Sequence, residues 1–105
     1  MKVDAVRRFA LSLPEATEEP HFHYTSFRIG GKIFATMPPS NDLLHVFVPD
    51  EDREAATAAH SDICEALHWG KRVVGVRVEL TKASASLVED LLRAAYDSKS
   101  QKRKQ

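Results

Sequence analysis

The hydrophobic pattern changes its period several times along the chain, and each change marks a predicted element. Apolar residues recur at helical spacing over residues 3–13, and Pro14 ends this predicted helix because the residue before a proline is driven out of the α region. Residues 15–20 are predicted to form an acidic connector. Residues 26–37 contain two apolar-rich runs joined by a Gly-Gly pair, which predicts a β-hairpin.

The faces of this hairpin depend on the length of its loop. With a two-residue loop, Arg28 lies opposite Ile33 and each face mixes apolar and charged residues. With a three-residue loop, Phe27 lies opposite Ile33 and the apolar residues gather on one side. We favour the three-residue loop, because a register that buries one clean face is strongly preferred. On that register one face carries Phe27, Ile33, Ala35 and Met37, and the other carries Ser26, Arg28, Lys32, Phe34 and Thr36.

The middle of the chain predicts two further strands with helical structure between them. Residues 43–48 alternate as a strand that is apolar on both faces, and residues 71–80 show the strongest strand pattern of the sequence. Between them, the acidic residues 50–52 open a helix, where negative charge is favourable against the helix dipole. Residues 61–67 are predicted to add a short helical turn.

The last predicted helix begins after a serine, either Ser84 or Ser86, and its apolar stripe ends before Asp97. Beyond that point the sequence is polar and basic, which is typical of a frayed terminus. We therefore predict one domain over residues 1–97 and a basic, disordered C-terminal tail over residues 98–105.

The order of these elements predicts an α+β fold. Consecutive strands favour an antiparallel meander, so we expect a two-layer sandwich with an antiparallel sheet of at least four strands and the helices packed on one face. The predicted core consists of Phe27, Ile33, Ala35, Leu44, Val46, Val76, Val78, Leu87, Leu91 and Leu92. The other sheet face has no helical cover, and any binding function is expected there.

Composition narrows the function classes. The chain has 105 residues, with 15 basic and 15 acidic side chains, so its formal net charge is zero. A domain that binds nucleic acid through phosphates usually has a basic balance, so neutrality argues against that class unless the cations are clustered. The single cysteine excludes an internal disulfide. The sequence has neither a signal peptide nor an apolar run long enough to cross a membrane, which predicts a cytoplasmic protein.

Several short sequence features also carry a family resemblance. Leu13-Pro14 closes the first helix, Glu18-Glu19 precedes Pro20, residues 27–35 read Phe-Arg-Ile-Gly-Gly-Lys-Ile-Phe-Ala, and Trp69-Gly70 precedes a valine-rich strand. In this order they resemble the MmcQ/YjbR-like family of small bacterial proteins, from about Val3 to Tyr96. The resemblance implies a fold similar to the secretion-chaperone-like sandwiches and a DNA-binding role based on a "double-wing" likeness. It supplies no catalytic residue and no cofactor.

Catalytic and metal-binding patterns are weak in this sequence. His21 and His23 would point the same way in an extended segment, but a zinc site needs three or four placed ligands. Cys64 and His60 are four residues apart and would face each other on a helix, yet no glycine-rich oxyanion loop accompanies them. We therefore expect a protein that is not an enzyme and that has no metal and no cofactor.

The uncovered sheet face is the strongest candidate for a site. Cations interleaved with aromatic rings on a sheet are what single-stranded nucleic acid uses, and the basic residues of the tail, Lys99 to Lys104, would add phosphate contacts. The same face would also suit a protein partner or a homodimer, or it is covered by residues 21–24 and Trp69 of the chain itself. The candidate binding residues are Arg28, Lys32, Phe34, His45, Phe47 and Arg77.

Overall fold

A computed structural model describes residues 1–39 and 42–103, with side chains described as far as residue 100. Its elements are α1 (Val3–Ser12), β1 (Thr17–His21), β2 (Tyr24–Ile29), β3 (Lys32–Met37), β4 (Leu43–Val46), α2 (Asp50–Ala59), β5 (Cys64–Trp69), β6 (Arg72–Glu79) and α3 (Ala85–Arg103). The strands form one antiparallel sheet in the order β1-β2-β3-β4-β6-β5. The predicted α+β class is confirmed.

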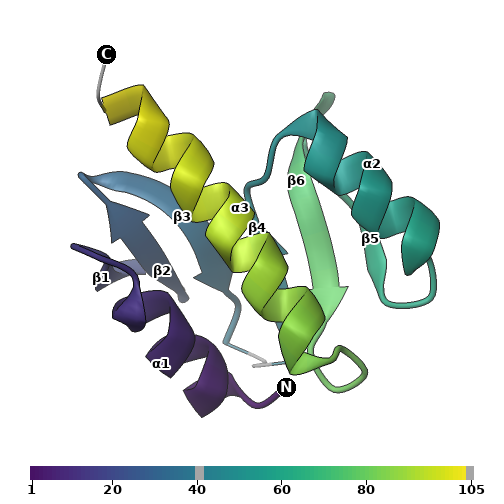
Figure 1. The fold of residues 1–105 in the computed structure, drawn as a ribbon, viewed down its shortest axis with the longest axis horizontal. Helices are drawn as coiled ribbons and strands as arrows, with labels where there is room; N and C mark the ends of the chain where they lie inside the picture. Colours follow the sequence, from purple (N-terminus) through teal and green to yellow (C-terminus); the bar gives the residue numbers. More distant parts are fainter. Residues whose placement is uncertain (40–41, 104–105) are drawn as a thin grey trace.

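The helices lie on the same side of the sheet, as predicted (Figure 1). Helix α3 crosses the middle of the sheet diagonally and packs on β3, while α2 covers β5 and β6. Helix α1 packs beside α3, and the Tyr96 hydroxyl of α3 donates a hydrogen bond to the Pro14 carbonyl at 2.6 Å. No helix of residues 1–39 and 42–103 lies on the opposite sheet face. None of the described helices is both long and apolar enough to cross a membrane.

The core lies between the sheet and the helices and contains most of the predicted residues. Fully or nearly fully buried are Phe27, Ala35, Leu44, Val46, Val76, Val78, Leu91 and Leu92, and Leu87 packs against them while partly exposed. Ile33 is the exception, because it is only half-buried and lies outside the core cluster.

The loop of the β2–β3 hairpin differs from the prediction. Ile29 pairs with Lys32, so the turn contains only Gly30 and Gly31. Their φ angles are 59° and 80°, and a tight two-residue hairpin turn needs positive φ at both positions. The favoured three-residue loop is therefore wrong near the turn.

A β-bulge then changes the register within the same hairpin. Arg28 pairs with Ile33, but the preceding residue, Phe27, pairs with Ala35, so Phe34 is an extra residue on β3. With the two-residue turn, Ile33 lies opposite Arg28 and Phe34 points to the helix-covered side, and the bulge keeps Ala35 and Met37 on that side as well. A two-residue turn with a bulge therefore still buries an apolar face. The comparison of two-residue and three-residue loops assumes hairpins without a bulge, so it does not include this arrangement.

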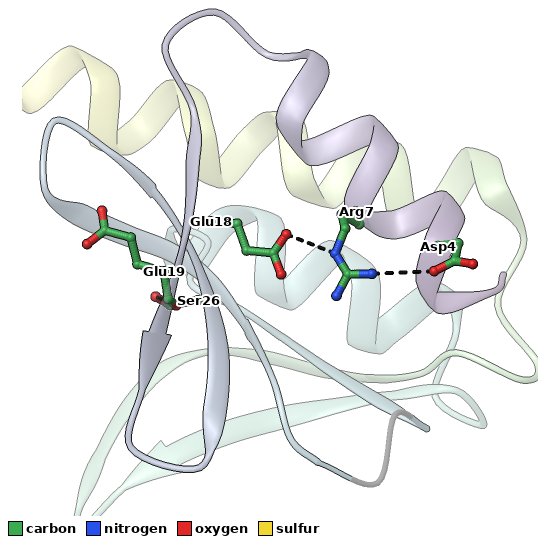
Figure 2. A network of polar contacts seen from close by, with 5 residues as sticks. All are labelled: Asp4, Arg7, Glu18, Glu19 and Ser26. Atoms are coloured by element: carbon green, nitrogen blue, oxygen red, sulfur yellow. Dashed lines mark hydrogen bonds and ion pairs between the residues drawn. The ribbon is translucent and has the colours of Figure 1, made fainter.

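Strand β1 replaces the predicted acidic connector. It pairs with β2 along its whole length, and the Ser26 hydroxyl donates to the Glu19 carbonyl at 2.7 Å. Glu18 points to the helix side, where Arg7 Nε donates to its Oε1 at 2.8 Å (Figure 2). The strand escapes periodicity analysis because its side chains are mostly exposed, and backbone pairing rather than an apolar face holds it.

Strand β5 replaces the short helical turn predicted over residues 61–67. It pairs antiparallel with β6, so Cys64 and His60 do not face each other on a helix. Their closest described link is a backbone hydrogen bond from the Cys64 N–H to the His60 carbonyl, at 2.8 Å. Burial raises the pKa of the Cys64 thiol, which keeps it protonated and poorly nucleophilic.

Both ends of α3 bear on the predictions. The Ser84 hydroxyl accepts a hydrogen bond from the Leu87 N–H at 3.1 Å, so Ser84 caps the helix. The helix continues to Arg103, past Asp97, where the lost apolar stripe predicted its end. Lys104 of the predicted basic tail and the Ser40-Asn41 part of a predicted turn lie outside the described residues.

Candidate ligand cleft on the open sheet face

A row of polar residues crosses the sheet on the side away from the helices. Each strand contributes one residue, and each residue is the register partner of the next, so all six share one face. In spatial order the row is Glu19, Ser26, Thr36, His45, Arg77 and Glu65. Two of the predicted site residues, His45 and Arg77, are thereby brought side by side.

A cleft of about 380 Å³ lies over the middle of this row. One wall comes from the β1–β2 hairpin and the other from the β5–β6 hairpin, the two hairpins at opposite edges of the sheet. The lining residues are His21, Phe22 and Tyr24 on one side, Leu67, His68 and Trp69 on the other, and Thr36, His45 and Arg77 at the floor. Residues 21–24 and Trp69 thus cover part of the face, in line with the alternative that the chain covers this face itself, and they leave a cleft between them.

Aromatic rings dominate the two walls. Tyr24 lies against His45, with ring centroids 5.9 Å apart, and Trp69 packs edge-on against Phe47, with centroids 5.4 Å apart. Trp69 remains 58% exposed. Phe22, in the turn between β1 and β2, is 90% exposed and has a φ of 60°, a left-handed conformation that costs roughly 1–2 kcal/mol for a residue with a Cβ.

The charges on the floor nearly cancel. Arg77 Nη2 forms an ion pair with Glu65 Oε1 on the neighbouring strand. Burial, and then the positive charge of Arg77, lower the pKa of His45, so this imidazole is neutral at neutral pH. The floor therefore combines a neutral imidazole, a hydroxyl and a compensated guanidinium, and it offers hydrogen bonds rather than net charge.

The structure separates the other predicted site residues from this floor. Phe34 is fully buried on the helix side, where its ring meets Tyr96 edge-on at 5.8 Å between centroids, so its predicted place on the open face is wrong. Phe47 follows β4 and is only 7% exposed beneath Trp69. Arg28 is half-buried and its Nε donates to Ser26 Oγ at 3.0 Å.

Lys32 is exposed at the start of β3 and does not line the cleft. Only two of the nine lining residues, His45 and Arg77, belong to the predicted site, and the other seven are His21, Phe22, Tyr24, Thr36, Leu67, His68 and Trp69. The signals in the sequence are the aromatic-rich segment 21–24 and the Trp69-Gly70 pair, which are predicted above as a cover of the face rather than as part of a site. Among the described residues, no group of three or more histidine, cysteine or acidic side chains is placed to hold a metal ion.

A comparison with protein families gives a match over most of the chain. The model of the YjbR family matches residues 11–98. The chain belongs to the YjbR family. This confirms the resemblance seen in the sequence, and the matched region includes all six strands and both hairpins that form the cleft.

One solved structure supports the fold of this YjbR-family chain. The crystal structure of Deinococcus radiodurans protein DR2400, a DUF419 protein, is similar with a TM-score of 0.77 and 24% sequence identity. The similarity covers 90% of this chain and 75% of that chain. At this identity the likeness shows the fold alone. A search of curated proteins gives no match.

Proposed function

We propose that this chain is a non-enzymatic nucleic-acid-binding module that holds DNA against the open sheet face. The observation that carries the proposal is the pair of edge hairpins, each of which presents an exposed aromatic ring, Phe22 on one and Trp69 on the other, beside the same cleft. Aromatic side chains on an open sheet stack on bases, and nearby cations neutralise phosphates.

The cations needed for phosphate contacts lie on the β5–β6 hairpin. Lys71 and Arg72 are exposed and form no ion pair with an acidic side chain in the described parts of the chain. Arg72 is the register partner of Trp69, so both side chains lie on the same face of the hairpin. By contrast, Arg7 and Arg53 on the helix side are neutralised by acidic neighbours.

This distribution reconciles DNA binding with a net charge of zero. Acidic side chains offset Arg7 of α1 and Arg53 of α2, whereas Lys71 and Arg72 of the β5–β6 hairpin have no such partner among the described residues. Arg28 and Lys32 of the β2–β3 hairpin also lack an acidic partner among the described residues, so they are a second candidate contact region. Charge placement, more than the sum, decides phosphate binding.

The test measures the anisotropy of fluorescently labelled single-stranded and double-stranded DNA at about 50 mM and about 200 mM salt. If Lys71 and Arg72 each neutralise one phosphate, this fourfold rise in salt weakens binding roughly seven- to twelvefold. Lys71→Glu/Arg72→Glu should abolish binding, and Arg28→Glu/Lys32→Glu tests the second hairpin.

The matched control is Lys2→Glu/Arg8→Glu, which makes the same change in net charge at exposed positions at the start of α1 and within it. It should bind like the wild type. Absence of binding at the lower salt concentration, or an equal loss in the control and in the β5–β6 variant, would overturn the proposal.

The exposed rings also favour a second candidate, a protein-interaction module that uses the same face for an apolar partner or a second copy. Phe22 and Trp69 are large apolar side chains in contact with water, as at many protein interfaces. Light scattering on the same samples tests self-association. A dimer that resists salt and is lost in Trp69→Ser would support this candidate over DNA binding.

A further inference from the structure

Two polar side chains at the floor of the cleft lack hydrogen-bond partners. Thr36 is only 4% exposed, and its hydroxyl has no partner among the described residues. His45, its register partner on β4, has a buried Nε2 that is likewise unpaired. Ser26 lies in the same row, but its hydroxyl both donates to Glu19 and accepts from Arg28.

Unpaired buried polar groups are rare in folded proteins, and they require an explanation. The buried Nε2 of His45 is such a group, and the Thr36 hydroxyl beside it on the floor of the cleft also has no partner among the described residues, which indicates hydrogen bonds that an external ligand completes. The cleft is about 380 Å³, at the small end of the range for ligand pockets.

The chemistry of the cleft favours a neutral, flat ligand over a phosphate. The Arg77 charge is already compensated by Glu65, and the imidazole beside it is neutral, so the floor has little attraction for an oxyanion. The walls offer the rings of Tyr24 and Trp69, which are surfaces for stacking. A heteroaromatic ring with a hydrogen-bonding edge matches both the walls and the floor.

We infer that the cleft holds one unpaired base of a nucleic-acid strand, with its faces against the aromatic walls and its edge hydrogen-bonded to Thr36 and His45. The inference rests on the proposed function and specifies a single-stranded ligand. A base within a duplex is stacked on both faces and paired along its edge, so it cannot enter the cleft. Lys71 and Arg72 then contact phosphates outside the cleft.

The test uses the fluorescence of Trp69, the single tryptophan of the chain. The full chain is titrated with a single-stranded oligonucleotide, with the same strand annealed to its complement, and with free deoxyadenosine monophosphate. We expect the single strand to quench Trp69 in a saturable way and the duplex to bind at least about tenfold more weakly without quenching. Free nucleotide should bind more weakly than the strand, since it lacks the flanking phosphates.

Thr36→Val isolates the hydrogen bond to the base, because valine keeps the shape of threonine and removes only the hydroxyl. We expect about fivefold weaker binding of the single strand, the loss of one ordinary hydrogen bond, while Tm stays level or rises because no partner is lost. Thr57→Val is the control, since that hydroxyl, on α2, donates to the Arg53 carbonyl at 3.0 Å. It should lower Tm slightly and leave binding unchanged.

Each outcome decides between the two proposals. If the duplex binds as tightly as the single strand, or Thr36→Val binds like the wild type, the base-binding inference is wrong and the proposed function stands. Should free nucleotide bind tightly and the strand not at all, the cleft takes a free nucleotide instead, and the inference also fails. If no nucleic acid binds, both fail. His45→Phe is a second variant in case valine at position 36 disturbs the sheet. It should also weaken binding of the single strand and leave Tm level or raise it.

Discussion

The burial of Phe34 yields the sharpest test of the fold, because the register with a three-residue loop would place this ring in solvent on the open face. In the structure the side chain is 0% exposed, lies 6.5 Å from the Phe27 ring and meets Tyr96 of α3 edge-on. Truncation of a buried phenylalanine to alanine typically costs about 3–5 kcal/mol, the sum of lost burial and of the cavity left behind. Against a total stability of about 5–15 kcal/mol for a domain, that loss is large.

We therefore expect Phe34→Ala to lower Tm by roughly 15–30 °C, measured by circular dichroism during thermal unfolding. Phe22→Ala makes the same chemical change at an exposed ring. Phenylalanine and alanine both carry a Cβ, so the strain of the positive φ at position 22 is the same in the wild type and in the variant. The control should change stability by less than about 0.5 kcal/mol. If the two variants differ by less than about 1 kcal/mol, Phe34 does not lie in the core and the two-residue turn is wrong.

Two further predictions concern the junction of β4 and β6. Gly75→Ala should lower the free energy of unfolding by about 3 kcal/mol or more, measured by chemical unfolding, because an added Cβ would lie 2.1 Å from the Val46 carbonyl oxygen. The control is Gly70→Ala, where the added Cβ meets open space and only the φ of 60° is unfavourable, so the loss should be about 1 kcal/mol. Because the pKa of His45 is lowered in the folded chain, the imidazole takes up a proton more readily in the unfolded chain. The neutral His45 side chain therefore contributes its full stability above about pH 6.5, and this contribution is lost as the pH falls. A fall in pH from about 7.5 to about 5.5 should therefore lower the Tm of the wild type more than the Tm of His45→Phe, as measured by thermal unfolding.

The sequence predicted those elements whose residues carry a strong period. Strand β6 alternates clearly, and α2 and α3 carry their acidic start and apolar stripe. Strand β1 was not predictable in this way, because its residues Thr17–His21 have no apolar alternation and backbone hydrogen bonds to β2 define it. In β5, Glu65, Ala66 and Leu67 favour a helix locally, yet pairing with β6 outweighs that propensity.

The candidate site was predictable only in part. His45 and Arg77 were placed on the open face because each lies in a strand with clear alternation, and the structure confirms that they are register partners. Phe34 is misplaced because the favoured three-residue loop shifts β3 by one residue against the observed two-residue turn, and a shift of one residue moves a side chain to the other face of the sheet. The aromatic walls come from hairpins whose curvature over the sheet leaves no periodic signal in the sequence.

The strand order also has a consequence for the order in which the molecule assembles. Strands β1 to β4 each pair with the next along the chain, and β5 pairs with β6, so these hairpins form from nearby residues. The junction of β4 with β6 instead requires closure of a loop that contains α2 and β5, which is slower and entropically more costly. His45 and Arg77 face each other across that junction, and each wall of the cleft belongs to a different side of it. The cleft is therefore absent from either half alone, and we expect a ligand bound there to tie the two halves together and to slow unfolding of the chain.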